Sequence, residues 1–223
     1  MERRRRLLPR SVNVEIFADV VCPWCYLGQA RFRQALATFD DDVQVTWRPF
    51  RLDPDAPVTA TPATPHLAVK FGGAERVAEA YDRLRGLAAA EGLPYEPERG
   101  MHVNTGDAHR VIWLAGREGG PALQDAVAER LFRGQHAEGR DLGDAGTLAE
   151  LAGSAGLAPE AVRSLLSSEE GLAELEQDLE RALELGITGV PFFLFEGTWG
   201  VSGAQSAETL TGALREVAGN LTS

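Results

Sequence analysis

Apolar and polar residues alternate in two short segments near the start of the chain. Residues 12–18 and residues 43–50 place β-branched and aromatic side chains at every second position. A period of two is typical of strands that bury one face. Between them, residues 26–39 carry apolar side chains at helical spacing. A strand, a crossover helix and a second strand predict a right-handed parallel unit.

The middle of the chain follows a different pattern. Residues 53–64 are rich in Pro, Ala and Thr without periodicity and predict a loop that leaves the sheet. From about 64 to 185, apolar residues recur every three or four positions, which predicts a series of packed helices and no strand. The clearest apolar stripe consists of Leu172, Leu175, Leu179, Ala182 and Leu183.

The strand pattern returns near the end. Residues 192–195 are a continuous apolar run, typical of a fully buried strand. Residues 198–201 predict a fourth strand after a Glu-Gly turn, and a final helix follows from Ser206. We expect the four strands to form one mixed sheet, with the helices of about 64–185 as a separate layer.

The only two cysteines, Cys22 and Cys25, lie in a Cys-Pro-Trp-Cys motif where the first strand passes into the first helix. Pro23 suits the first helical position, because its missing N–H would have no partner there. Cys22 is therefore predicted at the helix N-cap, where free N–H groups and the helix dipole favour a thiolate. Cys25, one turn further on, can donate its S–H to that thiolate or resolve a mixed disulfide.

Two other interpretations of this pair remain open. It could be half of a zinc site, but zinc takes four ligands and the chain has no second cysteine pair. The four histidines, His66, His102, His109 and His136, show no H-x3–5-H spacing. The cysteines could also be inert core residues. The strand–motif–helix context favours redox chemistry over both, and we expect no metal site.

Composition and charge restrict the partners. The chain has 223 residues and a net charge of −11, which argues against nucleic acid or an anionic membrane as a partner. No apolar stretch approaches the length of a transmembrane helix. Arg3 to Arg6 are not followed by the apolar segment of a secretory signal, so residues 1–11 are predicted to be a basic, flexible tail. We expect a cytoplasmic protein, in which a disulfide is more often catalytic than structural.

Pro191 opens the third predicted strand, for which there are two interpretations. The first position of a strand tolerates proline. Alternatively, a cis Val190–Pro191 bond turns the backbone groups of Val190 outward, to pair with an extended substrate. A second candidate, His109, either lies over the active site and touches substrate or is an ordinary packed or solvated helical histidine.

Four segments together resemble the DsbA-like branch of the thioredoxin superfamily, and most closely its cytoplasmic FrnE-type group. They are Phe17–Gly28 (FADVVCPWCYLG), Asp107–Arg110 (DAHR), Gly189–Phe193 (GVPFF) and Gly203–Ser206 (GAQS). The resemblance implies an α/β thioredoxin fold, a central mixed sheet flanked by helices, with a large α-helical insertion between the second and third strands. Residues 12–52 and 186–223 would form the thioredoxin-fold domain, and 53–185 the inserted domain.

The resemblance also implies a protein disulfide oxidoreductase. Cys22 would be the nucleophile, Cys25 the resolving thiol and Pro191 a cis proline. Independently of the resemblance, Val190, Trp24 and His109 are further candidate substrate contacts. Substrates would be thiol- or disulfide-containing proteins or small molecules. No cofactor is implied, only a recycling thiol system, for which glutathione is possible.

Two rival functions stay open. A glutathione-dependent transferase or isomerase of the kappa type shares this architecture but has serine where Cys22 stands. A chaperone-like peptide binder would use the groove beside Pro191, with the cysteines incidental.

Two departures limit what the resemblance implies. Many superfamily members carry a buried acid six residues before the first cysteine, where this chain has Ile16. Asp19 is the nearest carboxylate that could relay protons, but we expect it to be a solvated loop residue. Trp24 replaces the histidine common in periplasmic oxidants, so a strongly oxidising potential does not follow.

Overall fold

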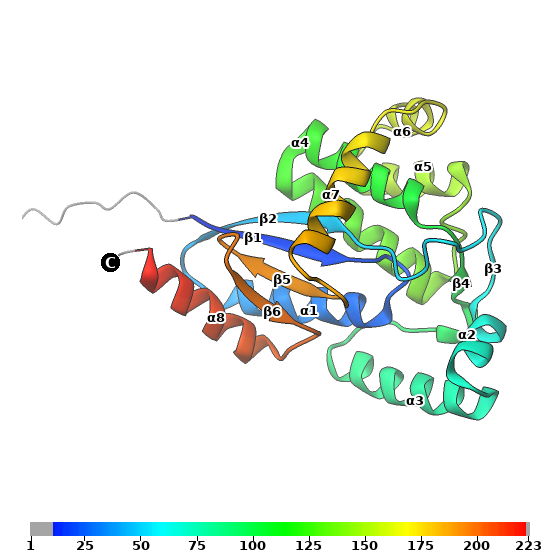
Figure 1. The fold of residues 1–223 in the computed structure, drawn as a ribbon, viewed down its shortest axis with the longest axis horizontal. Coiled ribbons are helices and arrows are strands. Elements are labelled where there is room, and N and C mark those ends of the chain that lie inside the picture. The colour runs from blue at the N-terminus through cyan, green and yellow to red at the C-terminus, as the bar shows by residue number, and fades with distance from the viewer. Residues whose placement is uncertain (1–10, 222–223) are drawn as a thin grey trace, which may run out of the picture.

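A four-stranded mixed sheet forms the centre of the computed structural model, which describes residues 11–221 (Figure 1). The strand order is β2-β1-β5-β6, with β1 parallel to β2 and antiparallel to β5. This confirms the predicted sheet. The predicted tail lies outside the described residues except for Ser11, the first residue of β1. The strands are β1 (Ser11–Ala18), β2 (Asp42–Pro49), β5 (Phe192–Phe195) and β6 (Trp199–Ser202).

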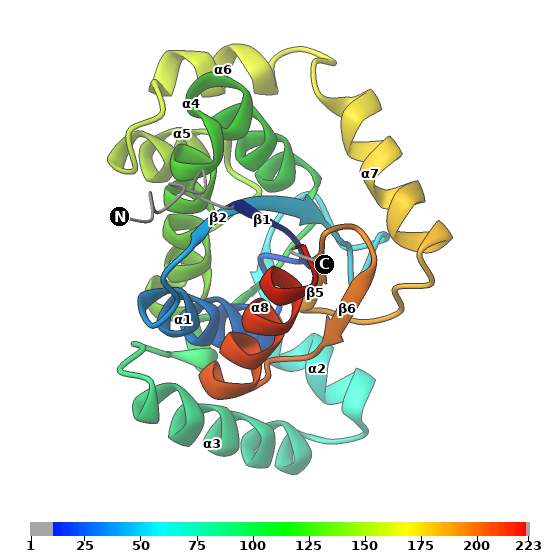
Figure 2. The same ribbon diagram turned by 90° about the vertical axis from the view of Figure 1, so that its left-hand side faces the viewer.

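Helices cover both faces of this sheet. Helices α1 (Pro23–Ala37) and α8 (Ala207–Asn220) contact each other on one side, and α7 (Leu172–Glu184) crosses the other (Figure 2). Helix α4 (Gly106–Arg133) packs along β2 and bends at Gly120, next to Pro121. Within residues 11–221, no helix combines the length and the apolar character needed to cross a bilayer.

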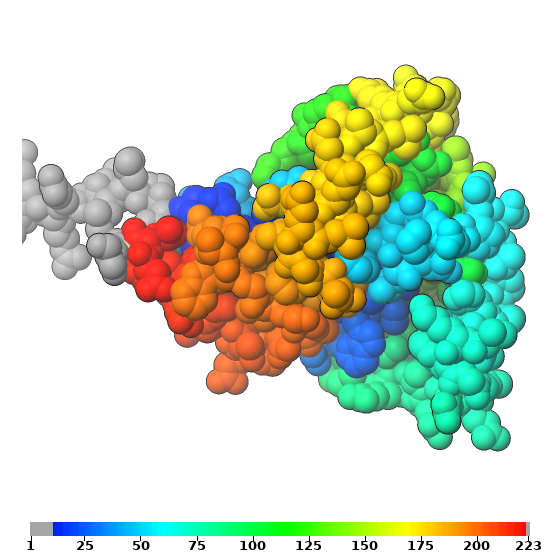
Figure 3. Space-filling view, in the orientation of Figure 1, coloured from blue at the N-terminus to red at the C-terminus, as the bar shows by residue number. Residues whose placement is uncertain are grey.

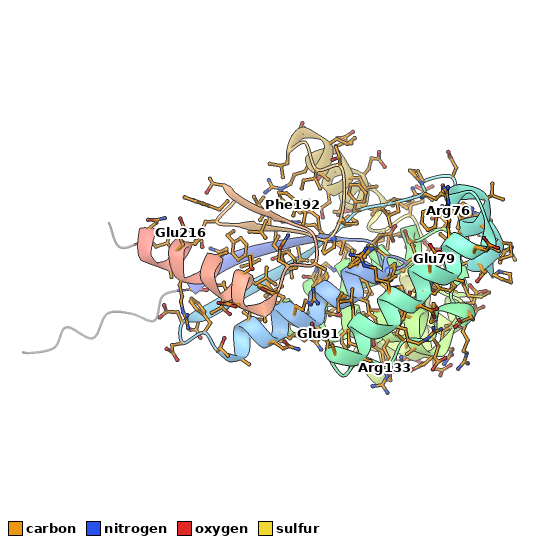
Figure 4. The ribbon with its side chains drawn as sticks, turned by 90° about the horizontal axis from the view of Figure 1, so that it is seen from below. Arg76, Glu79, Glu91, Arg133, Phe192 and Glu216 are labelled. Atoms are coloured by element: carbon orange, nitrogen blue, oxygen red, sulfur yellow. The ribbon has the colours of Figure 1, made fainter. Side chains whose placement is uncertain are left out.

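The remaining helices extend the fold away from the sheet. Figure 3 shows α2 and α3 as a lobe at one end of the molecule. An ion pair between Arg31 and Glu91 joins α1 to the end of α3, where Figure 4 labels Glu91. These elements are α2 (Ala63–Phe71), α3 (Ala74–Ala90), a 3-10 turn (Pro97–Arg99), a π-helical turn (Gly134–Glu138), α5 (Ala145–Ser154) and α6 (Pro159–Leu166).

The expectation of no strand between residues 64 and 185 is wrong. Strand β4 (Met101–His102) pairs antiparallel with β3 (Thr61–Pro62), which itself lies in the predicted loop. Pro94, Pro97 and Gly100 disfavour a continuous helix before β4. The extended chain instead bonds to β3, so the ribbon ties the start of the insertion to its middle.

Helix α7 docks with only part of its predicted apolar stripe. Ala182 is buried, whereas Leu172 and Leu183 leave 44% and 74% of their surface exposed. Two ion pairs join α7 to the sheet, Arg48 with Asp178 and Arg181 with Glu15. The expectation that the whole stripe is packed is therefore wrong, because charged residues occupy part of the docking face.

The main apolar core is continuous between sheet and insertion. It includes Val14 and Phe193 from the sheet, Phe132 from α4 and Leu148 from α5. Such sharing means that the two parts stabilise each other by burial of common apolar surface. The division into domains at 53 and 185 stays a prediction.

Candidate active site

The Cys-Pro-Trp-Cys motif forms the turn into α1, as the sequence predicts. Strand β1 ends at Ala18, and the amide of Cys22 donates a hydrogen bond to the Asp19 carbonyl over 2.9 Å. Cys22 is the N-cap residue in extended conformation, and Pro23 follows in the first turn. Both cysteines are free thiols and are buried, with 4% and 1% of their surface exposed.

The turn at Val190 and Pro191 lies against the first cysteine. The thiol of Cys22 donates a hydrogen bond to the Val190 carbonyl, with 3.8 Å between sulfur and oxygen. The Val190–Pro191 peptide bond is cis. A Cβ added to Gly28 would lie 2.8 Å from Pro191 Cγ, so only glycine lets the Pro191 ring pack this closely on α1. Gly28 is thus a positioning residue, which sequence analysis recorded only as the end of a motif.

The two sulfurs have different environments. Burial raises the pKa of the Cys25 thiol well above its ordinary value, and its hydrogen bond with Cys22 raises the pKa further. Cys25 therefore keeps its proton in this state. Cys22 instead lines an open cleft, where a substrate sulfur can reach it. The arrangement suits attack by the first thiol and later resolution by the second.

Asp19 is buried, contrary to the expectation of a solvated loop residue. Only 1% of its surface is exposed, and its Oδ2 accepts a 2.8 Å hydrogen bond from the amide of Leu52, which follows β2. Among the described residues, Oδ1 has no hydrogen-bond partner. Asp19 acts on the pKa of the Cys25 thiol in two opposite ways: a hydrogen bond with its backbone lowers that pKa, and the charge of its carboxylate raises it to a smaller extent. A buried carboxylate thus accompanies the resolving cysteine, from a position three residues before the first cysteine.

His109 is buried rather than presented to a substrate. Its Nε2 lies 3.1 Å from the Phe50 carbonyl and 3.5 Å from Asp19 Oδ1. A carbonyl can only accept, so Nε2 carries the proton and donates it to Phe50. Arg110, the next residue, donates hydrogen bonds to the carbonyls of Leu165, Ser168 and Glu170. The Asp-Ala-His-Arg motif therefore fastens α4 to the sheet and to the loop before α7.

A cleft of about 700 Å³ opens beside the first cysteine. Cys22, Trp24 and Val190 line one side, while residues of α2 and α3 line the other. Trp24 also stacks under the guanidinium of Arg83, which lies 5.8 Å from the ring centroid. The structure thus brings two of the predicted substrate contacts, Trp24 and Val190, to one cleft with the nucleophile.

His136 is a residue of this cleft that sequence analysis missed. Its ring stacks on Tyr26, with 5.3 Å between centroids, and its Nε2 donates to the Val20 carbonyl over 3.0 Å. Burial lowers the pKa of His136 to about 4, so the ring is neutral at neutral pH. The residue follows α4 in the π-helical turn, and no spacing in the sequence connects it with the cysteine motif.

Comparisons with known proteins agree with this geometry. The DSBA-like thioredoxin domain model matches residues 13–215. A probable DsbA oxidoreductase from Streptomyces coelicolor is 41% identical with a TM-score of 0.87, covering 93% of this chain and 90% of that one. The uncharacterized protein YwbO of Bacillus subtilis is 26% identical over 207 residues, 84% of this chain and 88% of that protein.

A more distant structure shares the fold. The cytosolic disulfide reductase DsbM of Pseudomonas aeruginosa has a TM-score of 0.66 at 18% identity, covering 92% of this chain and 98% of that one. At this identity the likeness shows the fold alone. The family model matches most of the chain, residues 13–215. The chain therefore belongs to the DsbA-like thioredoxin domain family of thiol–disulfide oxidoreductases.

Proposed function

We propose that this protein exchanges thiols and disulfides through mixed disulfides formed at Cys22. The difference between its two sulfurs carries the proposal, because one faces a cleft and the other is held as a buried thiol. The Cys22 thiolate attacks a substrate disulfide, and the outgoing substrate sulfur takes up a proton. Cys25 then loses its proton and attacks Cys22, which releases the second substrate thiol. The substrate gains two electrons and the protein becomes a disulfide; the reverse sequence oxidises a dithiol.

Asp19 is the proposed acceptor of the Cys25 proton. Its carboxylate is held by the Leu52 amide, is buried, and acts electrostatically on the Cys25 thiol, so it can take the proton without contact with bulk water. The other carboxylate oxygen, Oδ1, lies 3.5 Å from Nε2 of His109 and has no hydrogen-bond partner among the described residues, so it is free to take up a proton. Resolution needs such an acceptor because burial stabilises the protonated form of Cys25.

The proposal extends to the FrnE-type group and to the cytoplasm. The combination of the four sequence motifs supports the group, and the 41% identical probable oxidoreductase supports the chemistry. The exchange itself requires no cofactor. A cellular thiol system, with glutathione as a candidate, would recycle the pair, and the cleft has room for a small thiol or an extended peptide segment.

Single cysteine variants test the proposal. Cys25→Ser keeps the attacking sulfur but cannot resolve, so covalent complexes with a disulfide substrate should accumulate on non-reducing gels. Cys22→Ser should form no such complexes and should lose insulin reduction. If Cys22→Ser keeps glutathione conjugation while the wild type reduces no disulfide, the kappa-type transferase replaces this proposal. An unreactive pair with intact peptide binding would favour the chaperone-like alternative.

A further inference from the structure

Three residues from separate segments meet at the wall of the cleft. Asp53 follows β2, His66 lies on α2 and His102 lies in β4. One potential ligand atom from each lies within 4.8 Å of the others. Asp53 Oδ2 is 2.8 Å from His102 Nε2 and 3.8 Å from His66 Nε2. No spacing rule finds this cluster, because the pairing of β3 with β4 is what brings His102 to α2.

A purely structural role, in which the cluster holds the β3–β4 ribbon in place, explains only part of this arrangement. The hydrogen bond between Asp53 and His102 would tie β4 to the loop after β2. His66 adds nothing to that tie, since within the described part of the chain its ring nitrogens make no hydrogen bond. Its ring instead stacks on His102, with 3.7 Å between centroids. An imidazole without a hydrogen-bond partner, held beside a second imidazole and a carboxylate, is available as a ligand.

The chemistry and spacing of the cluster suit a transition-metal ion. Two imidazoles and one carboxylate form a recognised ligand set for divalent first-row ions. A tetrahedral zinc site with bonds of about 2.0–2.1 Å separates its ligand atoms by about 3.3 Å. The two Asp53–His distances, 2.8 and 3.8 Å, lie on either side of that value. Small side-chain movements would therefore complete the site.

We propose that Asp53, His66 and His102 bind a divalent first-row transition-metal ion, with Zn²⁺ as the best-fitting ion, at the wall of the cleft that contains Cys22. Three protein ligands leave a coordination position for a further donor. The cluster and the nucleophile line the same cleft, so that position can take an anionic group of a substrate. The ion adds a binding site to the cleft and takes no part in the electron balance of thiol exchange.

The test uses the full chain with both cysteines replaced by serine, because thiolates also bind zinc. After dialysis against EDTA, calorimetric titration with Zn²⁺ should give one ion per chain. Co²⁺ should give visible bands with the intensity of a tetrahedral site. In this background, His66→Gln should weaken Zn²⁺ binding by more than the roughly 10–100-fold typical of losing an outer-shell partner.

Two further variants distinguish binding of Zn²⁺ at the three proposed ligands from the electrostatic effect of other charged side chains in the cleft. Glu79→Gln removes a carboxylate from the same cleft, on α3 (Figure 4), and should leave Zn²⁺ affinity within about twofold. Lys70→Gln removes a cation whose charge acts on His66, and should strengthen binding. Thermal melting of each variant shows whether it folds.

Specific results would overturn the proposal. They are absence of Zn²⁺ binding in the cysteine-free chain, unchanged binding in His66→Gln, or a preference for Mg²⁺ or Ca²⁺. His102→Gln is a supporting variant, since it also breaks the hydrogen bond with Asp53. His66→Gln is decisive because it removes a ligand and no hydrogen bond. Insulin reduction by the wild type is measured separately, so a failed metal site leaves the thiol chemistry untouched.

Discussion

The thiol of Cys22 donates a hydrogen bond to the carbonyl of Val190, which lies 168 positions later in the chain. This contact joins the nucleophile to the wall of the cleft in the dithiol state. A sulfur in a mixed disulfide carries no proton, so the same carbonyl is then released. It can accept a backbone N–H from a bound substrate, as an added strand does. We therefore expect formation of the covalent bond and docking of the substrate backbone to be coupled through the Val190 carbonyl oxygen.

Cys22 should be alkylated faster than Cys25 at neutral pH. Cys22 lines the cleft, whereas burial raises the pKa of Cys25 and removes it from solvent. We expect at least about a tenfold ratio of iodoacetamide rates, followed by peptide mass spectrometry. In urea the two rates should converge. A faster Cys25 in the folded protein would contradict the assigned roles.

Asp19→Asn should slow resolution and spare attack. The amide keeps an acceptor for the Leu52 amide but cannot take up a proton from Cys25. Loss of a general base costs about 100-fold, so release from a trapped mixed disulfide should slow by that order at pH 7 and recover as pH rises. Stopped-flow fluorescence separates the two steps. Asp40→Asn, on an exposed turn, is the control. Equal slowing of attack and resolution would show a structural role only.

Gly28→Ala should destabilise the fold at the active site. The new methyl group would lie 2.8 Å from Pro191 Cγ, and the rigid ring cannot rotate away. Overpacking of this kind costs about 1–3 kcal/mol. Gly86→Ala, inside α3 with no atom within 4 Å of the added group, should instead stabilise by about 0.5–1 kcal/mol. Urea unfolding of the two variants provides the comparison. Equal stability of both variants would contradict the steric argument.

His136 should make folding sensitive to acid. Burial lowers its pKa in the folded state from about 6.5 to about 4, so below pH 6.5 the unfolded chain binds a proton that the folded chain refuses. The corresponding stability is present above pH 6.5, falls as the pH drops towards 4, and amounts to about 3 kcal/mol.

His136→Gln tests this dependence and retains an N–H for Val20. The difference in free energy of unfolding between wild type and variant should shrink from pH 7.5 to pH 4.5. Its value at pH 7.5 measures the lost stacking on Tyr26. A difference that does not change with pH would assign the acid sensitivity to other groups.

The local sequence pattern was sufficient to predict much of the fold around the site. Alternation predicted the strands, and Pro23 after Cys22 predicted the N-cap, because both depend on neighbouring residues alone. Trp24 and Val190 also line the cleft, and their role as substrate contacts stays a prediction.

The remaining features could not be predicted, because they depend on contacts between residues that are far apart in the sequence. In the sequence, Asp19 has the context of an ordinary turn residue. In the structure it is buried and accepts a hydrogen bond from the amide of Leu52. Leu183 has the spacing of a core residue, yet ion pairs at Asp178 and Arg181 decide how α7 docks. The cluster at His66 depends on which short strands pair, and two-residue strands carry almost no periodicity to detect.

The β3–β4 ribbon closes one part of the insertion, the segment that contains α2 and α3, at its base. Ala63 donates a backbone hydrogen bond to Gly100, so the chain of α2 and α3 leaves and returns at nearly the same point. A segment closed in this way can lengthen, shorten or be exchanged during evolution while the sheet and its cysteines stay in place. Since α2 and α3 line the cleft opposite Cys22, such changes would alter what the enzyme accepts without altering how it reacts.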